Sequence, residues 1–363
     1  MIHQTRRAAA AGLSALLLVG MACASDAKVS TDETDAPVAA AETTVAATAA
    51  EPTPEAGEDY SIFADKKFGI ISLAPGLEPV DRIQVNLEKC VTDNGGTVQV
   101  FDAKGGTEAV PAFEQANAAG VDAIYNIAND VSGGGLDAQL AAAGEAGRPV
   151  VTAWGGQRAG TYSITGLEFQ SAARVGQYVI DRLAADNDGV AAGTVLIANA
   201  RVTPSLRQRA DAFKAMVGPD TEFPDITVVE IEVDVANALA DTQAKVEQAI
   251  QSNPDISAVY ASFDTIGQGA ATAIDGAGGS QFVVSFNGDS TALDMIRTNK
   301  SFAATAANDL EGTGTIACDV FAQLLAGEAP SATTFWVDSP LVTQANVPAN
   351  GFVTGAGAFS LYP

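Results

Sequence analysis

The chain has 363 residues, with 44 acidic side chains against 19 Lys and Arg and a formal net charge of −25. Apolar residues make up 47% of the sequence, which is enough for a large core and excludes wholesale disorder. The acidic balance argues against nucleic-acid binding, because phosphate contacts need clustered Lys and Arg. The single histidine is His3. If export removes it, Ser-His-Asp and Cys-His catalysis are excluded and the usual zinc ligand is absent, so we expect neither metal nor cofactor.

Residues 1–22 have the pattern of an export signal peptide. A pair of arginines precedes an apolar or small-residue run over 8–21, which is too short to cross a bilayer. The run leads to Cys23, and residues 19–23 resemble the lipobox of bacterial lipoproteins, in which the cysteine is lipidated and becomes the first mature residue. Ordinary cleavage at the small-x-small stretch 22–24 is the alternative. Either way, the protein is expected to be exported, at the outer face of the cytoplasmic membrane or in the periplasm.

The segment 23–59 is rich in Ala, Thr, Glu and Pro and has no aromatic residue. It carries nine acidic residues and a single base, Lys28. Such a stretch buries too little apolar surface to offset its ordering entropy. We therefore expect a disordered acidic tether between the lipid-anchored cysteine and a folded body.

From Tyr60 onward, short runs rich in β-branched and aromatic residues alternate with Ala-rich helical patterns. Apolar strands separated by helices are typical of parallel sheets covered on both faces, so the sequence predicts a doubly wound α/β fold. The predicted strands are 68–72, 97–101, 122–127, 149–154, 194–198, 226–231, 256–261 and 282–286. The clearest predicted helices are 80–93, 109–119 and 136–146.

Internal sequence similarity suggests two similar lobes. Residues 121–125 are matched by 256–260, and about one helix later 150–155 is matched by 283–288. Chance similarity between buried strands is the alternative. Ligands of open α/β sheets sit beyond the carboxyl ends of the strands, so two facing lobes would enclose a cleft lined by those ends. In this alignment of the two halves, Trp154 of the first lobe occupies the position of Asn287 in the second lobe.

Four segments, taken in order and spacing, resemble type 1 periplasmic sugar-binding proteins of the ribose-binding class: 120–124, 148–151, 204–213 and 285–288. The resemblance covers nearly the whole chain from about Lys66. It implies two Rossmann-like lobes joined by a three-stranded hinge, a small ligand clamped between them, and delivery to an ABC importer. Residues 60–157 plus about 309–335 would form lobe 1, and residues 158–308 plus about 336–363 would form lobe 2. A monomer is expected.

The resemblance also implies ligand contacts. Asp130 matches a carboxylate of the first lobe that accepts hydrogen bonds from sugar hydroxyls, although a helix N-cap is its alternative role. Arg207 matches an arginine of the second lobe that donates to the ligand, whereas Arg209 is expected to be solvated or structural. Asn308 matches a polar amide at the last crossover between the lobes.

The chain departs from the family pattern at several of these positions. Phe263 stands before Asp264, at a position where relatives commonly have Asn. Asn287 stands where relatives commonly have Asp. This second change replaces a carboxylate, which only accepts hydrogen bonds, by an amide that both donates and accepts them. The first loop has no aromatic residue, and its Glu78 is either a new acceptor or a solvated residue. Trp154 and Phe263 are expected to stack on the ligand, with core packing as the alternative for each.

Two cysteines, Cys90 and Cys318, fall on helices at opposite ends of the body. In the family's fold the chain returns to lobe 1 after about Asn308, so both cysteines would belong to lobe 1. Outside the cell they can be oxidised, and we expect a disulfide between them.

The leading hypothesis is therefore a lipid-tethered solute receptor without enzymatic activity, whose ligand is a monosaccharide or polyol and whose partner is an ABC permease. A receptor for a membrane signalling sensor is the first alternative. A carbohydrate-active enzyme is another, because a carboxylate pair can hydrolyse glycosides without histidine. A transcriptional repressor of the lactose class has the same fold, but the export signal and the absence of a basic helix-turn-helix argue against it.

Overall fold

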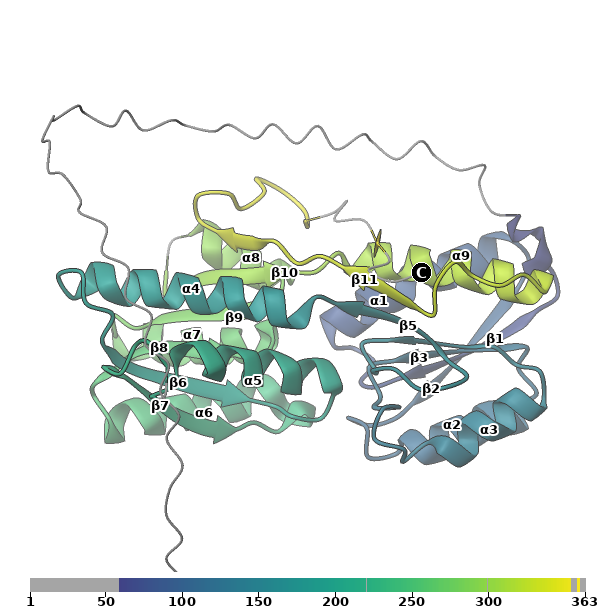
Figure 1. The fold of residues 1–363 in the computed structure, drawn as a ribbon, viewed down its shortest axis with the longest axis horizontal. Coiled ribbons are helices and arrows are strands. Elements are labelled where there is room, and N and C mark those ends of the chain that lie inside the picture. The colour runs from purple at the N-terminus through teal and green to yellow at the C-terminus, as the bar shows by residue number, and fades with distance from the viewer. Residues whose placement is uncertain (1–58, 220, 299, 354–357, 360–363) are drawn as a thin grey trace, which may run out of the picture. The chain divides into compact units, whose positions relative to one another are not determined.

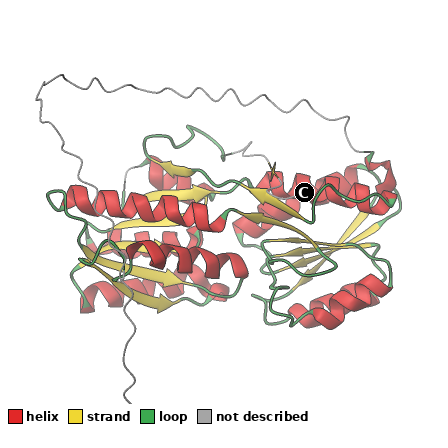
Figure 2. Ribbon diagram, in the orientation of Figure 1, coloured by secondary structure: helices red, strands yellow, loops and turns green. Residues whose placement is uncertain are grey.

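The computed structural model describes residues 59–219, 221–298 and 300–353, together with the backbone of 358–359. The expected signal peptide, Cys23 and the expected tether up to residue 58 lie outside these residues. Within them, no helix is long and apolar enough to cross a membrane. The described chain folds into two sheets, each covered by helices on both faces (Figure 1; Figure 2).

Sheet A has the strand order β13-β11-β5-β4-β3-β1-β2 and forms the first lobe. Its strands are parallel except for β13, which runs antiparallel to β11. One face carries α1 and α9, which pack against each other, and the other carries α2 and α3 (Figure 1). The elements are β1 (Lys67–Ser72), α1 (Glu78–Asp93), β2 (Thr97–Asp102), α2 (Ala109–Ala118), β3 (Ala123–Ile127), α3 (Asp137–Glu145), β4 (Val150–Ala153), β5 (Tyr162–Gly166), α9 (Leu310–Ala326), β11 (Thr334–Val337) and β13 (Ala358–Phe359).

Sheet B has the order β12-β10-β9-β8-β6-β7 and forms the second lobe. It is parallel except for β12, which pairs antiparallel with β10. Helices α4 and α5 cover one face, and α6, α7 and α8 cover the other. The elements are α4 (Glu168–Asp186), β6 (Gly193–Asn199), α5 (Pro204–Val217), β7 (Ile226–Glu232), α6 (Ala238–Ser252), β8 (Ile256–Ala261), α7 (Asp264–Ala277), β9 (Phe282–Asn287), α8 (Ser290–Arg297), β10 (Phe302–Ala307) and β12 (Leu341–Thr343).

Three passages between the lobes lie wholly within the described residues: from β5 to α4, from β10 to α9, and from β11 to β12. A further passage, from β12 to β13, is described only in part. The first passage lies near residue 167 rather than at residue 157, the boundary that the sequence suggested. Tyr162–Gly166 pairs with β4 and β11, so it belongs to sheet A. This strand is short and contains Ser, Thr and Gly, so it lacks the apolar run that marks the other strands. Strand β13, near the C-terminus, also returns to sheet A rather than lobe 2.

The central strands are almost entirely buried because helices cover both faces of each sheet. Strands β3, β4 and β9 are buried at every position, whereas the edge strands β2 and β7 are partly exposed. The predicted apolar runs therefore correspond to real strands, and the two lobes of the doubly wound α/β fold are confirmed.

Helices α1 and α9 are joined covalently as well as by packing. The structure pairs Cys90 with Cys318 as a disulfide, with a Cα–Cα distance of 6.5 Å and a sequence separation of 228 residues. The pairing is possible because the chain returns to sheet A after β10, which brings the first and last long helices of the lobe together.

Candidate functional site

A small cavity of about 60 Å³ lies between the two lobes. Its lining comes from the loops that follow the carboxyl ends of strands and from the first turns of helices, as expected for an α/β sheet. The lobe 1 lining is Leu73, Leu77, Pro79, Val80, Ile83, Ala128 and Trp154. The remainder, from lobe 2 and the second passage, is Thr203, Ser205, Leu206, Arg209, Val235, Phe263, Asn287 and Leu310.

Two of the lining residues have an unusual backbone. Trp154 has a φ of 55° and Asn287 a φ of 114°, values that residues other than glycine rarely adopt. Both residues stand at strand ends, after β4 and at the end of β9. Such strain persists only where the surroundings hold it in place, and it is frequent at ligand-binding sites. Here both residues with this conformation line the cavity.

A buried ion pair lies at the cavity. Glu168, at the start of α4, accepts two hydrogen bonds from Arg209 of α5, one from Nε and one from Nη2 at 3.2 Å. Both side chains are almost completely buried, with 1% and 2% exposed. Trp154 donates its indole N–H to the same carboxylate at 2.9 Å. The carboxylate therefore compensates the charge of the guanidinium and fixes the indole N–H of Trp154, a residue that lines the cavity.

The network continues to the other passages between the lobes. Asn287 Oδ1 accepts from Arg209 Nη1 at 3.2 Å and from Asn308 Nδ2 at 3.0 Å. Asn308 in turn accepts a hydrogen bond from the Ser339 hydroxyl. Glu168, Asn308 and Ser339 stand on the first, second and third passages, respectively. One buried hydrogen-bonded chain therefore links all three connecting segments to the wall of the cavity.

Asp130 and Arg207 pair with each other outside the cavity lining. Arg207 Nη2 donates to Asp130 Oδ2 at 2.5 Å across the two lobes, and Nη1 donates to the carbonyl of Arg201. The other Asp130 oxygen accepts from the backbone and hydroxyl of Ser132, which fixes its own loop. These hydrogen bonds and the guanidinium outweigh partial burial and hold the pKa of Asp130 below its usual range.

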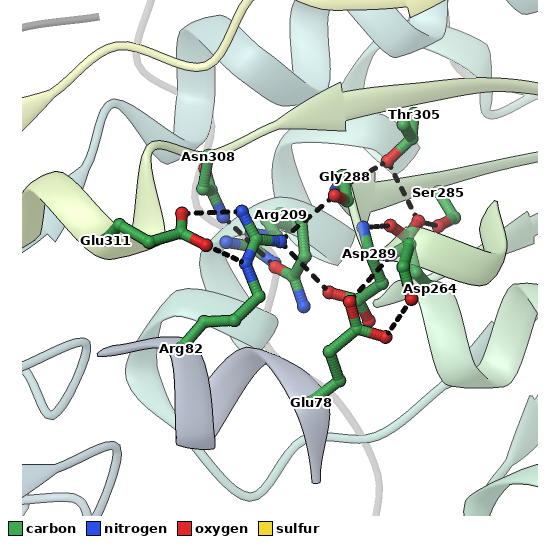
Figure 3. Close-up of polar contacts among 12 residues, drawn as sticks. Glu78, Arg82, Arg209, Asp264, Ser285, Gly288, Asp289, Thr305, Asn308 and Glu311 are labelled. Carbon is green, nitrogen blue, oxygen red and sulfur yellow. Dashed lines mark hydrogen bonds and ion pairs between the residues drawn. The ribbon is translucent and has the colours of Figure 1, made fainter. Parts of the chain in front are cut away.

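A second group of contacts joins the lobes through the start of α1 (Figure 3). Glu78 accepts from the backbone N–H of Ser290 at 2.7 Å and from its hydroxyl at 2.8 Å, so it caps the N-terminus of α8 from the opposite lobe. Arg82 forms a bidentate pair with Glu311 at 2.7 and 2.8 Å, and also donates to the carbonyl of Gly288 at 3.0 Å. Glu78 is therefore a partly exposed hydrogen-bond acceptor for the opposite lobe, and it does not line the cavity.

Asp264 and Asp289 form a fully buried acidic pair beside this contact (Figure 3). Asp264 accepts from the hydroxyls of Ser285 and Thr305 and from the backbone N–H of Asp289 at 2.7 Å. Burial nevertheless raises the pKa of Asp264 to about 6. Burial, and then the charges of Asp264 and Glu78, raise the pKa of Asp289 well above its usual range. Asp264 supports the loop after β9 and does not line the cavity.

Comparison with known proteins agrees with this architecture. A model of the periplasmic binding protein domain matches residues 79–329. The chain belongs to the periplasmic binding protein family. The ribose import binding protein of Bacillus subtilis is 24% identical over 262 residues, which is 71% of this chain and 80% of that protein.

Solved structures of transporter solute-binding proteins have a similar fold. A solute-binding protein of an ABC transporter from Mycobacterium smegmatis, with bound glycerol, has a TM-score of 0.69 and 23% identity, covering 80% of this chain and 100% of that one. The 5-methylthioribose transporter solute-binding protein from Thermotoga lettingae, in complex with 5-methylthioribose, has a TM-score of 0.69 and 22% identity. The match covers 78% of this chain and 87% of that one.

The structure divides the residues singled out in the sequence into three sets. Trp154, Phe263 and Asn287 line the cavity of this periplasmic binding protein. Asn308 contacts the lining through Asn287. The remaining four lie outside the lining: Asp130, Arg207, Asp264 and Glu78.

The cavity arginine is Arg209, for which a solvated or structural role was expected; its buried ion pair with Glu168 agrees with a structural role, but its place in the cavity lining was not expected. It is among the largest fully buried side chains and lines the cavity. A signal for this was present, because residues 205, 209 and 213 are spaced by four and share one face of α5. Ser205 and Phe213 are both buried. Arg207 is displaced from that face by two residues and points to the loop of Asp130.

Proposed function

We propose that this periplasmic binding protein is an exported receptor that clamps a small ligand of the sugar or polyol class for an ABC importer. The observation that carries the proposal is the cavity between two lobes, lined from both and linked by one hydrogen-bonded chain to all three passages. The sugar-transport relatives and the glycerol-bound structure support the ligand class.

The mechanism follows from contacts that require both lobes. Asp130 with Arg207, Glu78 with Ser290 and Arg82 with Gly288 exist together only when the lobes are closed. A ligand held by both lobes favours the closed state, because it can contact both lobes at once only when they are closed. The three passages act as the hinge, and the closed form is what the permease recognises.

The cavity groups serve as hydrogen-bonding partners rather than catalysts. Both oxygens of Glu168 accept hydrogen bonds from Arg209 and Trp154, so this carboxylate is engaged within the protein rather than with a ligand. We propose a monomeric receptor without enzymatic activity. Incubation with a panel of glycosides should release no sugar, whereas accumulation of product with time would contradict the receptor function.

Residues before the described body are proposed to attach the protein to the membrane. The lipobox-like sequence ending at Cys23 would place a lipid there after cleavage of residues 1–22, with the acidic segment 23–59 as the tether. Metabolic labelling with a radioactive fatty acid tests this. Label should enter the wild-type protein and be lost in Cys23→Ala, and label retained in that variant would contradict the anchor.

Binding itself can be measured through Trp154, one of two tryptophans in the chain. A screen of sugars, deoxysugars and polyols should reveal a compound that changes the indole fluorescence and raises the melting temperature. Trp154→Phe should abolish most of the fluorescence change while retaining the thermal shift. A screen with no thermal shift from any compound would contradict the proposed function.

A further inference from the structure

The polar and apolar sides of the cavity come from different lobes. The polar lining groups all belong to lobe 2: Thr203, Ser205 and Arg209 on α5 or at its start, and Asn287 at the end of β9. Lobe 1 contributes aliphatic side chains and the ring of Trp154, whose N–H is engaged by Glu168. A ligand in this cavity therefore meets hydrogen-bonding groups along one edge only.

The polar groups that remain for a ligand are few. The charge of Arg209 is compensated by Glu168, and four of its five N–H groups donate to Glu168, the Ser262 carbonyl and Asn287, so a single Nη2 hydrogen is left for a ligand. Among the described residues, Arg209 is the only charged side chain that lines the cavity. Asn287 uses its oxygen for Arg209 and Asn308, so its amide nitrogen is the group left to donate to a ligand.

The apolar side offers no partner for hydroxyl groups. Leu73, Leu77 and Val80 line the lobe 1 wall, and Phe263 with Val235 extends the apolar surface on lobe 2. Leu77 also packs against the apolar clusters of both lobes, so this wall is continuous across the cleft. A hydroxyl placed against it loses its hydration without replacement, which lowers affinity by about tenfold for each such group.

We propose, on the basis of the receptor function above, that the ligand is an uncharged and partly deoxygenated sugar. Its hydroxyls lie on the edge that faces Asn287 and α5. Its other edge carries a deoxy, alkyl or alkylthio group against Leu73, Leu77 and Val80 of lobe 1. The cavity thus selects against fully hydroxylated sugars and polyols.

A matched pair of probes tests the proposal. 5-Methylthioribose differs from ribose only in a methylthio group in place of the 5-hydroxyl, and glycerol is a fully hydroxylated reference. Titration calorimetry with the purified protein should give a dissociation constant for 5-methylthioribose at least about tenfold below that for ribose. Equal or tighter binding of ribose or glycerol would overturn the ligand class while leaving the receptor function intact. Failure of every compound in the wider screen would overturn the receptor function itself.

A variant of the apolar wall provides an independent test. Leu77 is the N-cap of α1 without a side-chain cap, and Asn is favoured at that position, so Leu77→Asn preserves the helix while adding a polar group to the wall. It should reduce the preference for 5-methylthioribose over ribose by at least about fivefold. Leu239→Asn, on an exposed position of α6 outside the cavity, is the control and should leave the preference unchanged. An unchanged preference in Leu77→Asn would overturn the proposal.

Discussion

Glu168 and Arg209 form a bidentate ion pair between the N-terminus of α4 and the middle of α5, where both side chains are excluded from water. The two charges compensate each other within the cavity wall. Removal of one partner leaves an uncompensated buried charge, which is much more costly than the loss of an exposed pair.

Glu168→Gln should therefore lower the free energy of unfolding by about 3 to 5 kcal/mol, measured by urea denaturation. The matched control is Asp186→Asn, which breaks an exposed pair with Arg182 and should cost at most about 0.5 kcal/mol. Similar losses in the two variants would show that Glu168 does not compensate the charge of Arg209.

Substitution of Asp130 or Arg207 should have a small effect on ligand affinity. The pair stands outside the cavity lining, and its side chains are 25% and 32% exposed, so it stabilises the closed state by at most about 1 kcal/mol. Arg207→Gln and Asp130→Asn should each weaken binding by about fivefold or less, and the double variant by no more than either single one. A loss of 100-fold in calorimetric titrations would instead indicate direct ligand contact.

Gly156 should be essential for closure. Its φ is +84°, and a Cβ atom there would stand 2.9 Å from Pro204 on the opposite lobe. Gly160 is the matched control, because its φ is +83° but nothing lies within 4 Å of its Cβ position. Both alanine variants should lose a similar amount of stability, roughly 1 to 2 kcal/mol. Only Gly156→Ala should lose ligand affinity as well, and equal affinities in the two variants would exclude a role in closure.

Stability should fall as the pH rises from about 4 through 6. Burial raises the pKa of Asp264 to about 6 and that of Asp289 well above its usual range, so the native state retains protons that the unfolded chain releases above about pH 4. Asp289→Asn removes one such proton and should make the fall shallower in denaturation curves recorded between pH 4 and 8. An equally steep fall in the variant would exclude Asp289 as its source.

Reduction of the Cys90–Cys318 bond should lower the free energy of unfolding by as much as about 5 kcal/mol, because the bond closes a loop of 228 residues. Thiol titration of the denatured, unreduced protein should find neither cysteine free. The variant Cys90→Ala with Cys318→Ala should reproduce the stability of the reduced protein. Two reactive thiols before reduction would contradict the bond.

Much of the fold was predictable from the sequence because its signal is local. Apolar runs such as that of β3 mark strands buried on both faces, and helix α2 was expected within one residue of its bounds. Strand β5 escaped prediction because its Ser, Thr and Gly residues form no apolar run. Its place in sheet A depends on pairing with β11, about 170 residues later. Long-range pairing of this kind leaves little trace in a single sequence.

The lining residues that stand at the ends of strands were predictable from the sequence. Trp154 and Asn287 follow from the rule that ligands lie beyond the carboxyl ends of strands, and both line the cavity. Which groups form hydrogen bonds with each other, rather than with a ligand, was not predictable in the same way. Asp130 and Arg207 are chemically suited to a ligand, yet they pair with each other because the closed lobes bring them together. The apolar role of Leu77 was not predictable either, because its packing against lobe 2 depends on how the two lobes meet.

The disulfide between α1 and α9 has a further consequence for an exported protein. The chain between the two cysteines contains all of β6 to β10, so nearly the whole second lobe is an insertion within a covalent ring. A protease that cuts once anywhere in that insertion produces two fragments that remain tied together through the first lobe. Such a nicked receptor keeps both lobes in one molecule, and only reduction of the bond separates them.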